Sequence, residues 1–211
     1  MPAPIVLVTG FSPFPSAPLN PTAWLIDRLR NDAWHPKGVR LSPHVLPTRF
    51  DVYETALQPL ITDLAPAAVV SFGLSAKATG VTLERFARNA VAVGRADVAG
   101  VCAANATLDP TGRSLRASTL PLAAAAQRLE DAGVPWEWSE DAGDYICNLA
   151  FYRTLGSCAQ SGVPSGFVHV PYTDTMARTL NLDGTHATLS EDQLLAGAKA
   201  VLSTVAETIL C

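Results

Sequence analysis

The sequence predicts an α/β protein, a three-layer α/β/α sandwich with a mainly parallel twisted sheet, in a single domain over residues 1–211. Short apolar and β-branched runs at 5–9, 67–72 and 167–170 are typical of strands covered on both faces. Helical patterns alternate with these runs, and no repeat or low-complexity segment interrupts them. A chain of 211 residues with 48% hydrophobic and 16% charged residues can bury one sizeable core.

The first half of the chain begins with a run, IVLVT, that ends at Gly10. Asn20 followed by Pro21 gives an N-cap and first-turn pair, and the apolar positions after it predict the first helix. The elements expected here are a strand at 5–9, a helix from 21 onward with its apolar face at Trp24, Leu25, Ile26 and Leu29, a strand at 39–46 broken near Pro43, a helix at 52–64 stopped by Pro66, and a strand at 67–72.

In the second half, residues 81–89 alternate as a strand would, and residues 95–117 are assigned no element. Ser190 and Gln193 form a capping-box pattern before an apolar face that repeats to the chain end, which predicts a carboxy-terminal helix. The other elements expected are a helix at 121–129 stopped by Gly133, a short strand at 136–138, a helix at 145–155 and a core strand at 167–170.

Charge and hydropathy argue against two classes of partner. Fifteen basic residues stand against 19 acidic ones, for a net charge of −4, and no basic run could follow a phosphate backbone, so no nucleic acid is expected. The first residues, MPAPIVLVTGF, have no cationic region and are expected to form a strand rather than a secretory signal. No stretch is expected to be long enough to cross a bilayer, so no membrane partner is expected.

Four cysteines lie far apart, at positions 102, 147, 158 and 211. No C-x-x-C pair or histidine cluster accompanies them, so neither a zinc site nor a disulfide framework is expected, and no cofactor or metal is implied. We therefore expect the four thiols to be free and the protein to lie in a reducing compartment, the cytoplasm.

Three side chains are candidates for chemistry because a fold of this class exposes loops where they lie. Cys147 falls in the first turn of a predicted helix, where backbone N–H groups stabilise a thiolate, although a buried filler role is the commoner fate of a cysteine. His169 is either a hydrogen-bonded core residue or an imidazole presented at a strand end. Glu84 precedes Arg85 and, taken alone, is better explained as half of a surface ion pair than as a catalytic residue.

The turn TGFSPF follows the first strand but has one glycine where a phosphate loop needs several, so a nucleotide site is not supported. Phe11 and Phe14 are better suited to the walls of an apolar pocket.

Six segments in order give the chain a family resemblance. They are VLVTGFSPF with NPT soon after, LPTRF, VTLERFARN, STLP, AGDYICNLAFY and GFVHVPY. Over most of residues 4–172 the sequence resembles the pyroglutamyl peptidases, also called pyrrolidone-carboxylate peptidases.

The resemblance implies an α/β cysteine peptidase that removes an amino-terminal pyroglutamyl residue. By position, the family's nucleophile, base and orienting acid fall on Cys147, His169 and Glu84. Substrate-binding positions fall on Phe11, Phe14, Leu74, Tyr145 and Ile146. The resemblance further implies a small peptide substrate with a blocked amino terminus and a homo-oligomer, dimer or tetramer.

Two positions depart from the family pattern. Leu74 stands where the family has a glutamine facing the substrate, and Gly94 stands where it usually has an arginine, with Arg95 displaced by one position. Losing a hydrogen bond to a buried lactam would lower activity about ten- to a hundredfold. The alternatives are therefore a cysteine amidase of altered N-acyl specificity, or a non-hydrolytic homologue that binds a small ligand or a peptide end.

Overall fold

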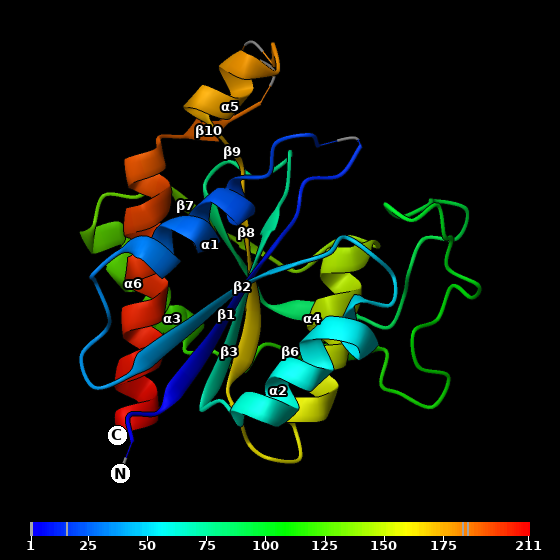
Figure 1. Cartoon of the computed structure of the whole chain (residues 1–211), viewed down its shortest axis with the longest axis horizontal. Coiled ribbons are helices and arrows are strands. Elements are labelled where there is room, and N and C mark those ends of the chain that lie inside the picture. The colour runs from blue at the N-terminus through cyan, green and yellow to red at the C-terminus, as the bar shows by residue number, and fades with distance from the viewer. Residues whose placement is uncertain (1, 16, 183, 185) are drawn as a thin grey trace.

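The computed structural model describes residues 2–15, 17–182, 184 and 186–211. Its centre is a six-stranded sheet in which four neighbouring strands are parallel and the last two run in the opposite direction (Figure 1). The mainly parallel sheet predicted from the sequence is therefore confirmed. In spatial order the strands are β2 (Arg40–Leu46), β1 (Ile5–Phe11), β3 (Ala68–Leu74), β8 (Ser165–Val170), β4 (Val81–Glu84) and β7 (Trp136–Ser139).

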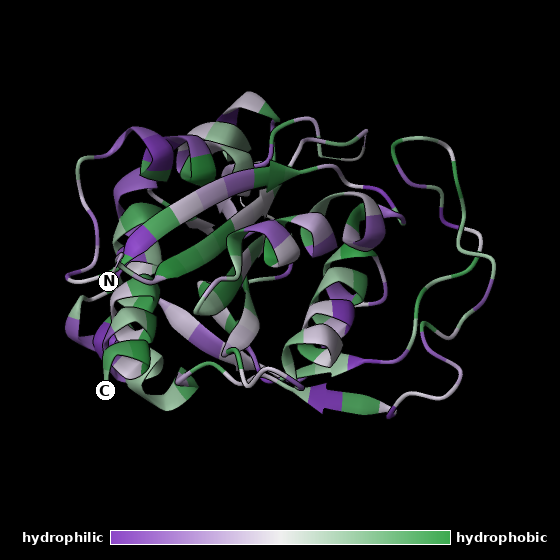
Figure 2. Cartoon of the chain, turned by 60° about the horizontal axis from the view of Figure 1, so that its bottom comes forward, coloured by the Kyte–Doolittle hydropathy of each residue, from purple (hydrophilic) through white to green (hydrophobic). Residues whose placement is uncertain are grey.

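Helices cover both faces of the sheet. One face carries α1 (Pro21–Asn31), α3 (Leu122–Asp131) and α6 (Glu191–Leu210), and the other carries a π-helical turn η1 (Tyr53–Leu57), α2 (Gln58–Leu64) and α4 (Ile146–Cys158) (Figure 1). Because side chains alternate along a strand, Val6 and Val8 of β1 enter the first core while Leu7 enters the second. Hydrophobic residues, green in Figure 2, run along the central strands, with hydrophilic patches on the surrounding helices and loops.

Shorter elements lie outside the central sheet. β5 (Phe86–Arg88) and β6 (Leu115–Ala117) form an antiparallel pair, and the segment 89–114 between them loops out beyond α4 (Figure 1). β9 (Tyr172–Thr173), α5 (Asp174–Thr179) and β10 (Thr188–Leu189) form a projection above the sheet. The sequence pattern did not indicate this projection, because its elements are too short for a clear periodicity.

The structure corrects the expected break of the second strand. Pro43 lies inside a continuous β2, opposite Val8 of β1. β2 is an edge strand of the sheet, so a missing N–H on its free side removes no ladder hydrogen bond. Residues 81–89, expected as a possible single strand, instead form β4 and β5, which belong to different sheets.

The expectation that no stretch is long enough to cross a bilayer is wrong for α6 by length and composition. This helix has 20 residues, and its mean hydropathy reaches 1.2 over a window that is half buried inside the fold. Its apolar side chains, such as Val201 and Val205, belong to the first core. The apolar face therefore packs inside the protein, as the predicted helical periodicity requires.

Both predicted helix starts are confirmed. Asn20 accepts a hydrogen bond from Thr22 N at 3.0 Å, and Ser190 and Gln193 form the reciprocal capping box of α6. These caps satisfy N–H groups that have no partner within their own helix.

Replacing Ser190 with alanine removes one half of this capping box. We expect Ser190→Ala to lower the free energy of unfolding by about 1 kcal/mol, measured by urea denaturation. Ser203→Ala, within the same helix, is the matched control and is expected to be neutral or slightly stabilising. Equal losses in both variants would contradict the capping account.

Candidate active site

Strand pairing brings His169 and Glu84 together at one end of the sheet. His169 of β8 lies opposite Gly73 of β3 and Thr82 of β4, and Glu84 is the last residue of β4. His169 Nδ1 and Glu84 Oε1 are 2.7 Å apart. The pair is buried, with 5% of His169 and 2% of Glu84 exposed. The two residues are therefore one hydrogen-bonded unit.

Glu84 does not form the surface ion pair with Arg85 that its position in the sequence suggested, among the contacts of the described residues. Arg85 instead pairs with the exposed carboxylate of Glu140. Glu84 Oε2 is buried and has no hydrogen-bond partner among the described residues. Since a buried carboxylate is costly without a counter-charge, the imidazole of His169 is the group that compensates it.

The surroundings of His169 favour its charged form. Burial acts to lower the pKa of this imidazole, but hydrogen bonds and charges from Cys147 and Glu84 outweigh burial and raise its pKa from 6.5 to about 9. Below that value the ring holds both protons. An imidazolium between a thiol and a carboxylate can stabilise a thiolate and donate a proton.

Cys147 is the second residue of α4, and its half-buried thiol interacts with the imidazole of His169 and raises the pKa of that ring. The N-cap residue Tyr145 provides no side-chain cap, so first-turn N–H groups beside Cys147 stay available for another acceptor. A Cβ atom at Gly73 would lie 3.0 Å from Cys147 Sγ and 2.6 Å from the Phe167 ring. Glycine at this position therefore leaves the space that the thiol occupies.

The other three cysteines lie in different environments. All four are free thiols; Cys102 and Cys211 are exposed, and Cys158 is buried at the far end of α4. Burial raises the pKa of the Cys158 thiol, which makes it less reactive. Within the described part of the chain, Cys147 is the cysteine that has a histidine–carboxylate pair beside it.

A cavity of about 580 Å³ opens onto Cys147 and His169. All five residues predicted to bind substrate line it: Phe11, Phe14, Leu74, Tyr145 and Ile146. Leu74 and Phe14 also pack against a buried cluster that includes Tyr172 and Ala177 of the projection above the sheet. The cavity wall that contains Leu74 is therefore continuous with the apolar cluster under the projection.

Further polar residues line the same cavity that the sequence reasoning did not assign to a site. Arg95, which it noted only as displaced from the family's arginine position, lies there together with Asn20, Thr48, Lys77, Asp141 and Asp144. A larger cavity of about 780 Å³ lies at the opposite ends of α4 and β8, near Cys158 and Ser165. Its lining includes none of the three candidate catalytic residues, so the smaller cavity is the relevant one.

Asn148, directly after Cys147, has a positioning role that the sequence reasoning missed. Its side chain is fully buried and bonds only to backbone: Oδ1 accepts from Arg88 N at 2.8 Å, and Nδ2 donates to Arg88 O at 2.9 Å and Ala90 O at 2.8 Å. Arg88 ends the strand β5 that follows Glu84. Asn148 thus ties the start of the nucleophile's helix to the segment that carries the carboxylate.

Replacing Asn148 with aspartate keeps the shape but turns two donated hydrogen bonds into repulsion between oxygens. We expect Asn148→Asp to slow alkylation of Cys147 by iodoacetamide at least tenfold, because the helix start shifts relative to His169. Mass spectrometry of the modified peptide gives the rate. Asn31→Asp makes the same chemical change at an exposed site and should leave the rate unchanged; a folded Asn148→Asp protein with the original rate would refute the positioning role.

Comparisons with known proteins agree with this geometry. A family model described as pyroglutamyl peptidase matches residues 5–208. A pyrrolidone-carboxylate peptidase of Pseudomonas fluorescens is 30% identical over 204 residues, covering 97% of this chain and 93% of the relative. One from Mycobacterium tuberculosis is 33% identical over 177 residues, covering 82% of this chain and 79% of the relative.

Solved structures give the same result. A mutant pyrrolidone carboxyl peptidase from Pyrococcus furiosus superimposes with a TM-score of 0.89 at 27% identity, covering 97% of this chain and 99% of that one. The pyroglutamyl peptidase I of Bacillus amyloliquefaciens gives a TM-score of 0.87 at 25% identity, with 96% and 95% covered. This protein therefore belongs to the pyroglutamyl peptidase family and is a cysteine peptidase.

Proposed function

We propose that this protein hydrolyses the amide bond after an amino-terminal pyroglutamyl residue, with Cys147 as nucleophile, His169 as general acid and base, and Glu84 as the group that orients the histidine. The observation that carries the proposal is one cluster of three side chains. His169 lies 2.7 Å from Glu84 and interacts with the Cys147 thiol, and Cys147 and His169 line the same cavity. Thiol, imidazole and carboxylate in this order form the set that nucleophilic acyl transfer needs.

In the first step the Cys147 thiolate attacks the pyroglutamyl carbonyl carbon, and the carbonyl π pair moves to oxygen. When the tetrahedral intermediate collapses, the C–N bond breaks and protonated His169 gives its proton to the departing amine. In the second step water attacks the thioester, neutral His169 takes the water's proton, and the Cys147 thiolate leaves. Pyroglutamate is released and the imidazolium–thiolate pair is restored.

The start of α4 supports the developing negative charge. First-turn N–H groups beside Cys147 have no side-chain cap, so they are available to donate to the oxyanion of a carbonyl attacked by this thiol. The positive end of the helix acts in the same direction. Nucleophile and oxyanion donors thus come from a single helix end.

The pocket suits an uncharged ring. The rings of Phe11 and Phe14 give flat apolar surfaces for a lactam, Ile146 adds an aliphatic one, and Leu74 replaces a polar partner with another apolar wall. Leu74 favours the second candidate, a cysteine amidase with altered N-acyl specificity. Activity on pyroglutamyl amides compared with acetyl-prolyl and cyclopentanoyl amides separates the two candidates.

The family and the relatives that match this chain are peptidases, which supports a soluble protein. A cytoplasmic location is a further part of the proposal, and the exposed free thiols of Cys102 and Cys211 support it. A homo-oligomer, dimer or tetramer, is proposed from the family resemblance, and light scattering measures it. A small peptide with a blocked amino terminus is the proposed substrate.

Release of the fluorescent amine from pyroglutamyl-7-amido-4-methylcoumarin tests the function. We expect activity from the wild-type protein, loss of activity in Cys147→Ala, and full activity in the control Cys102→Ala, which removes an exposed thiol instead. Iodoacetamide should inactivate the wild type and Cys102→Ala alike. A folded wild-type protein without activity, or an active Cys147→Ala protein, would rule out the proposal.

Glu84→Gln tests the role of the carboxylate. Protonated His169 is needed to release the amine, so kcat/KM should fall as pH rises through about 9, the raised pKa of His169. Without the Glu84 charge this pKa drops, so the decline should begin at lower pH, and kcat should fall by about 10²-fold or more. Glu140→Gln removes an exposed carboxylate and should change neither. An unshifted pH profile in Glu84→Gln would argue against the role of Glu84.

A further inference from the structure

The cavity contains positive charge that an uncharged lactam does not require. Lys77 and Arg95 both line it, from segments that follow β3 and β5 respectively. Among the ion pairs of the described residues, none involves either side chain. The walls expected around the acyl ring are apolar, so these two cations are left for another part of the substrate.

Arg95 is held in a defined place. Its guanidinium lies over the Tyr145 ring, 3.9 Å from the ring centre, and Tyr145 Oη donates to the carbonyl of Ala96 at 2.8 Å. Phe50 packs against the same ring in a T-shaped arrangement, with 5.5 Å between the centroids. Because Tyr145 is two residues before Cys147, this stack fixes a positive charge beside the start of the nucleophile's helix.

Asp97 fixes the backbone that carries Arg95. This carboxylate is buried and accepts N–H groups from Phe50 at 2.9 Å, Ala99 at 2.8 Å and Val101 at 3.0 Å. Burial acts to raise the pKa of Asp97, but these three hydrogen bonds and the charge of Arg49 outweigh it and lower its pKa. The carboxylate therefore stays ionised and keeps the loop closed against the site.

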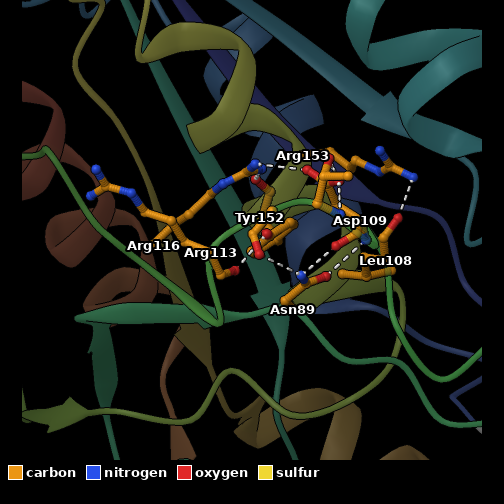
Figure 3. Close-up of polar contacts among 9 residues, drawn as sticks. Asn89, Leu108, Asp109, Arg113, Arg116, Tyr152 and Arg153 are labelled. Atoms are coloured by element: carbon orange, nitrogen blue, oxygen red, sulfur yellow. Dashed lines mark hydrogen bonds and ion pairs between the residues drawn. The ribbon is translucent and has the colours of Figure 1, made fainter.

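The base of the 89–114 segment is attached to α4 by a polar network (Figure 3). Asn89 and Asp109 exchange hydrogen bonds at 2.6 and 2.8 Å, Tyr152 Oη donates to Arg113 O at 2.7 Å, and Arg153 donates to Leu108 O at 2.8 Å. Arg116, just beyond the segment, donates to Tyr152 O at 2.8 Å. The segment that presents Arg95 is therefore anchored to the helix that carries Cys147.

Two carboxylates line the same cavity, and their effect has to be weighed against the cations. Asp141 lies 2.6 Å from Arg88 and accepts the N–H of Gly143, so its charge is already compensated. Asp144 remains as the one carboxylate without such compensation among the lining residues that the structure describes. The two positive charges of Lys77 and Arg95 outnumber the one negative charge of Asp144, so the cavity has an excess of positive charge.

On the basis of the proposed hydrolysis, we infer that Arg95 and Lys77 select substrates whose leaving group carries a carboxylate close to the scissile bond. In a pyroglutamyl dipeptide the free α-carboxylate is attached to the carbon next to the departing nitrogen. The attack of Cys147 therefore brings that carboxylate into the cavity. Guanidinium groups bind carboxylates through two parallel hydrogen bonds, and the exposed side chains of Arg95 and Lys77 leave their charges accessible to such a group. The preferred substrates are therefore short pyroglutamyl peptides in which the residue after pyroglutamate carries a carboxylate, either a free carboxy terminus or an acidic side chain.

The direct test compares pyroglutamyl-alanine with pyroglutamyl-alaninamide, which differ only in the carboxylate. Release of alanine or alaninamide is followed by reaction of the new amine with o-phthalaldehyde. We expect kcat/KM to be about tenfold or more higher for the free acid at low salt, through a lower KM, because charge-assisted hydrogen bonds are the stronger kind. The preference should weaken as salt is added.

Variants assign the preference to the two cations. Arg95→Ala and Lys77→Ala should each lower the ratio of kcat/KM for the acid to that for the amide, and Arg95→Lys should retain part of it because the charge remains. Arg40→Ala is the matched control: it removes one positive charge from an exposed residue at the start of β2 and should leave the ratio unchanged.

The outcomes separate this inference from the proposed function. Cleavage of both compounds at equal rates would overturn the carboxylate preference and leave the peptidase activity standing. A preference for pyroglutamyl-lysine amide over the alanine compounds would also overturn it and point to Asp144. If neither compound nor the coumarin amide is cleaved, the proposed function itself fails. A lowered ratio in Arg40→Ala would attribute the preference to the overall charge of the protein rather than to Arg95 and Lys77.

Discussion

The site depends on one buried interaction, the hydrogen bond between His169 and Glu84. A carboxylate that is 2% exposed is tolerable only if a positive group compensates it, and the imidazole, raised to a pKa of about 9, is that group. The same charge then stabilises a thiolate at Cys147. The cost of burying Glu84 and the reactivity of the thiol are therefore two consequences of a single contact.

The sheet provides the geometry for this contact. The last two strands run opposite to the other four, and β4 is thereby antiparallel to β8, with Thr82 opposite His169 and Glu84 close beyond it. A fully parallel sheet would have placed the two residues in a different register. α4 has no ladder to hold it to the sheet, and its place is set by core packing and by the three backbone hydrogen bonds of Asn148.

Much of this could be predicted from the sequence, since strand and helix patterns and the order of six segments carry strong signals. Cys147, His169 and Glu84 were identified by residue type, local context and resemblance. Asn148 was missed because its hydrogen-bond partners, Arg88 and Ala90, lie about 60 residues away in the chain and leave no local pattern. Asp97 bonds locally to Ala99 and Val101, but its hydrogen bond from Phe50, 47 residues away, leaves no such pattern either. The predicted break of β2 at Pro43 was wrong, because the sequence alone does not reveal that this strand lies at the edge of the sheet.

The protonation state of His169 tests the central claim most directly. NMR of protein labelled with ¹⁵N in the histidine rings, titrated from pH 6 to 10, follows this ring separately from His35, His44 and His186. The account predicts that both ring nitrogens of His169 stay protonated at pH 7 and that the ring loses its proton near pH 9. A neutral His169 ring at pH 7 in the folded enzyme would contradict it.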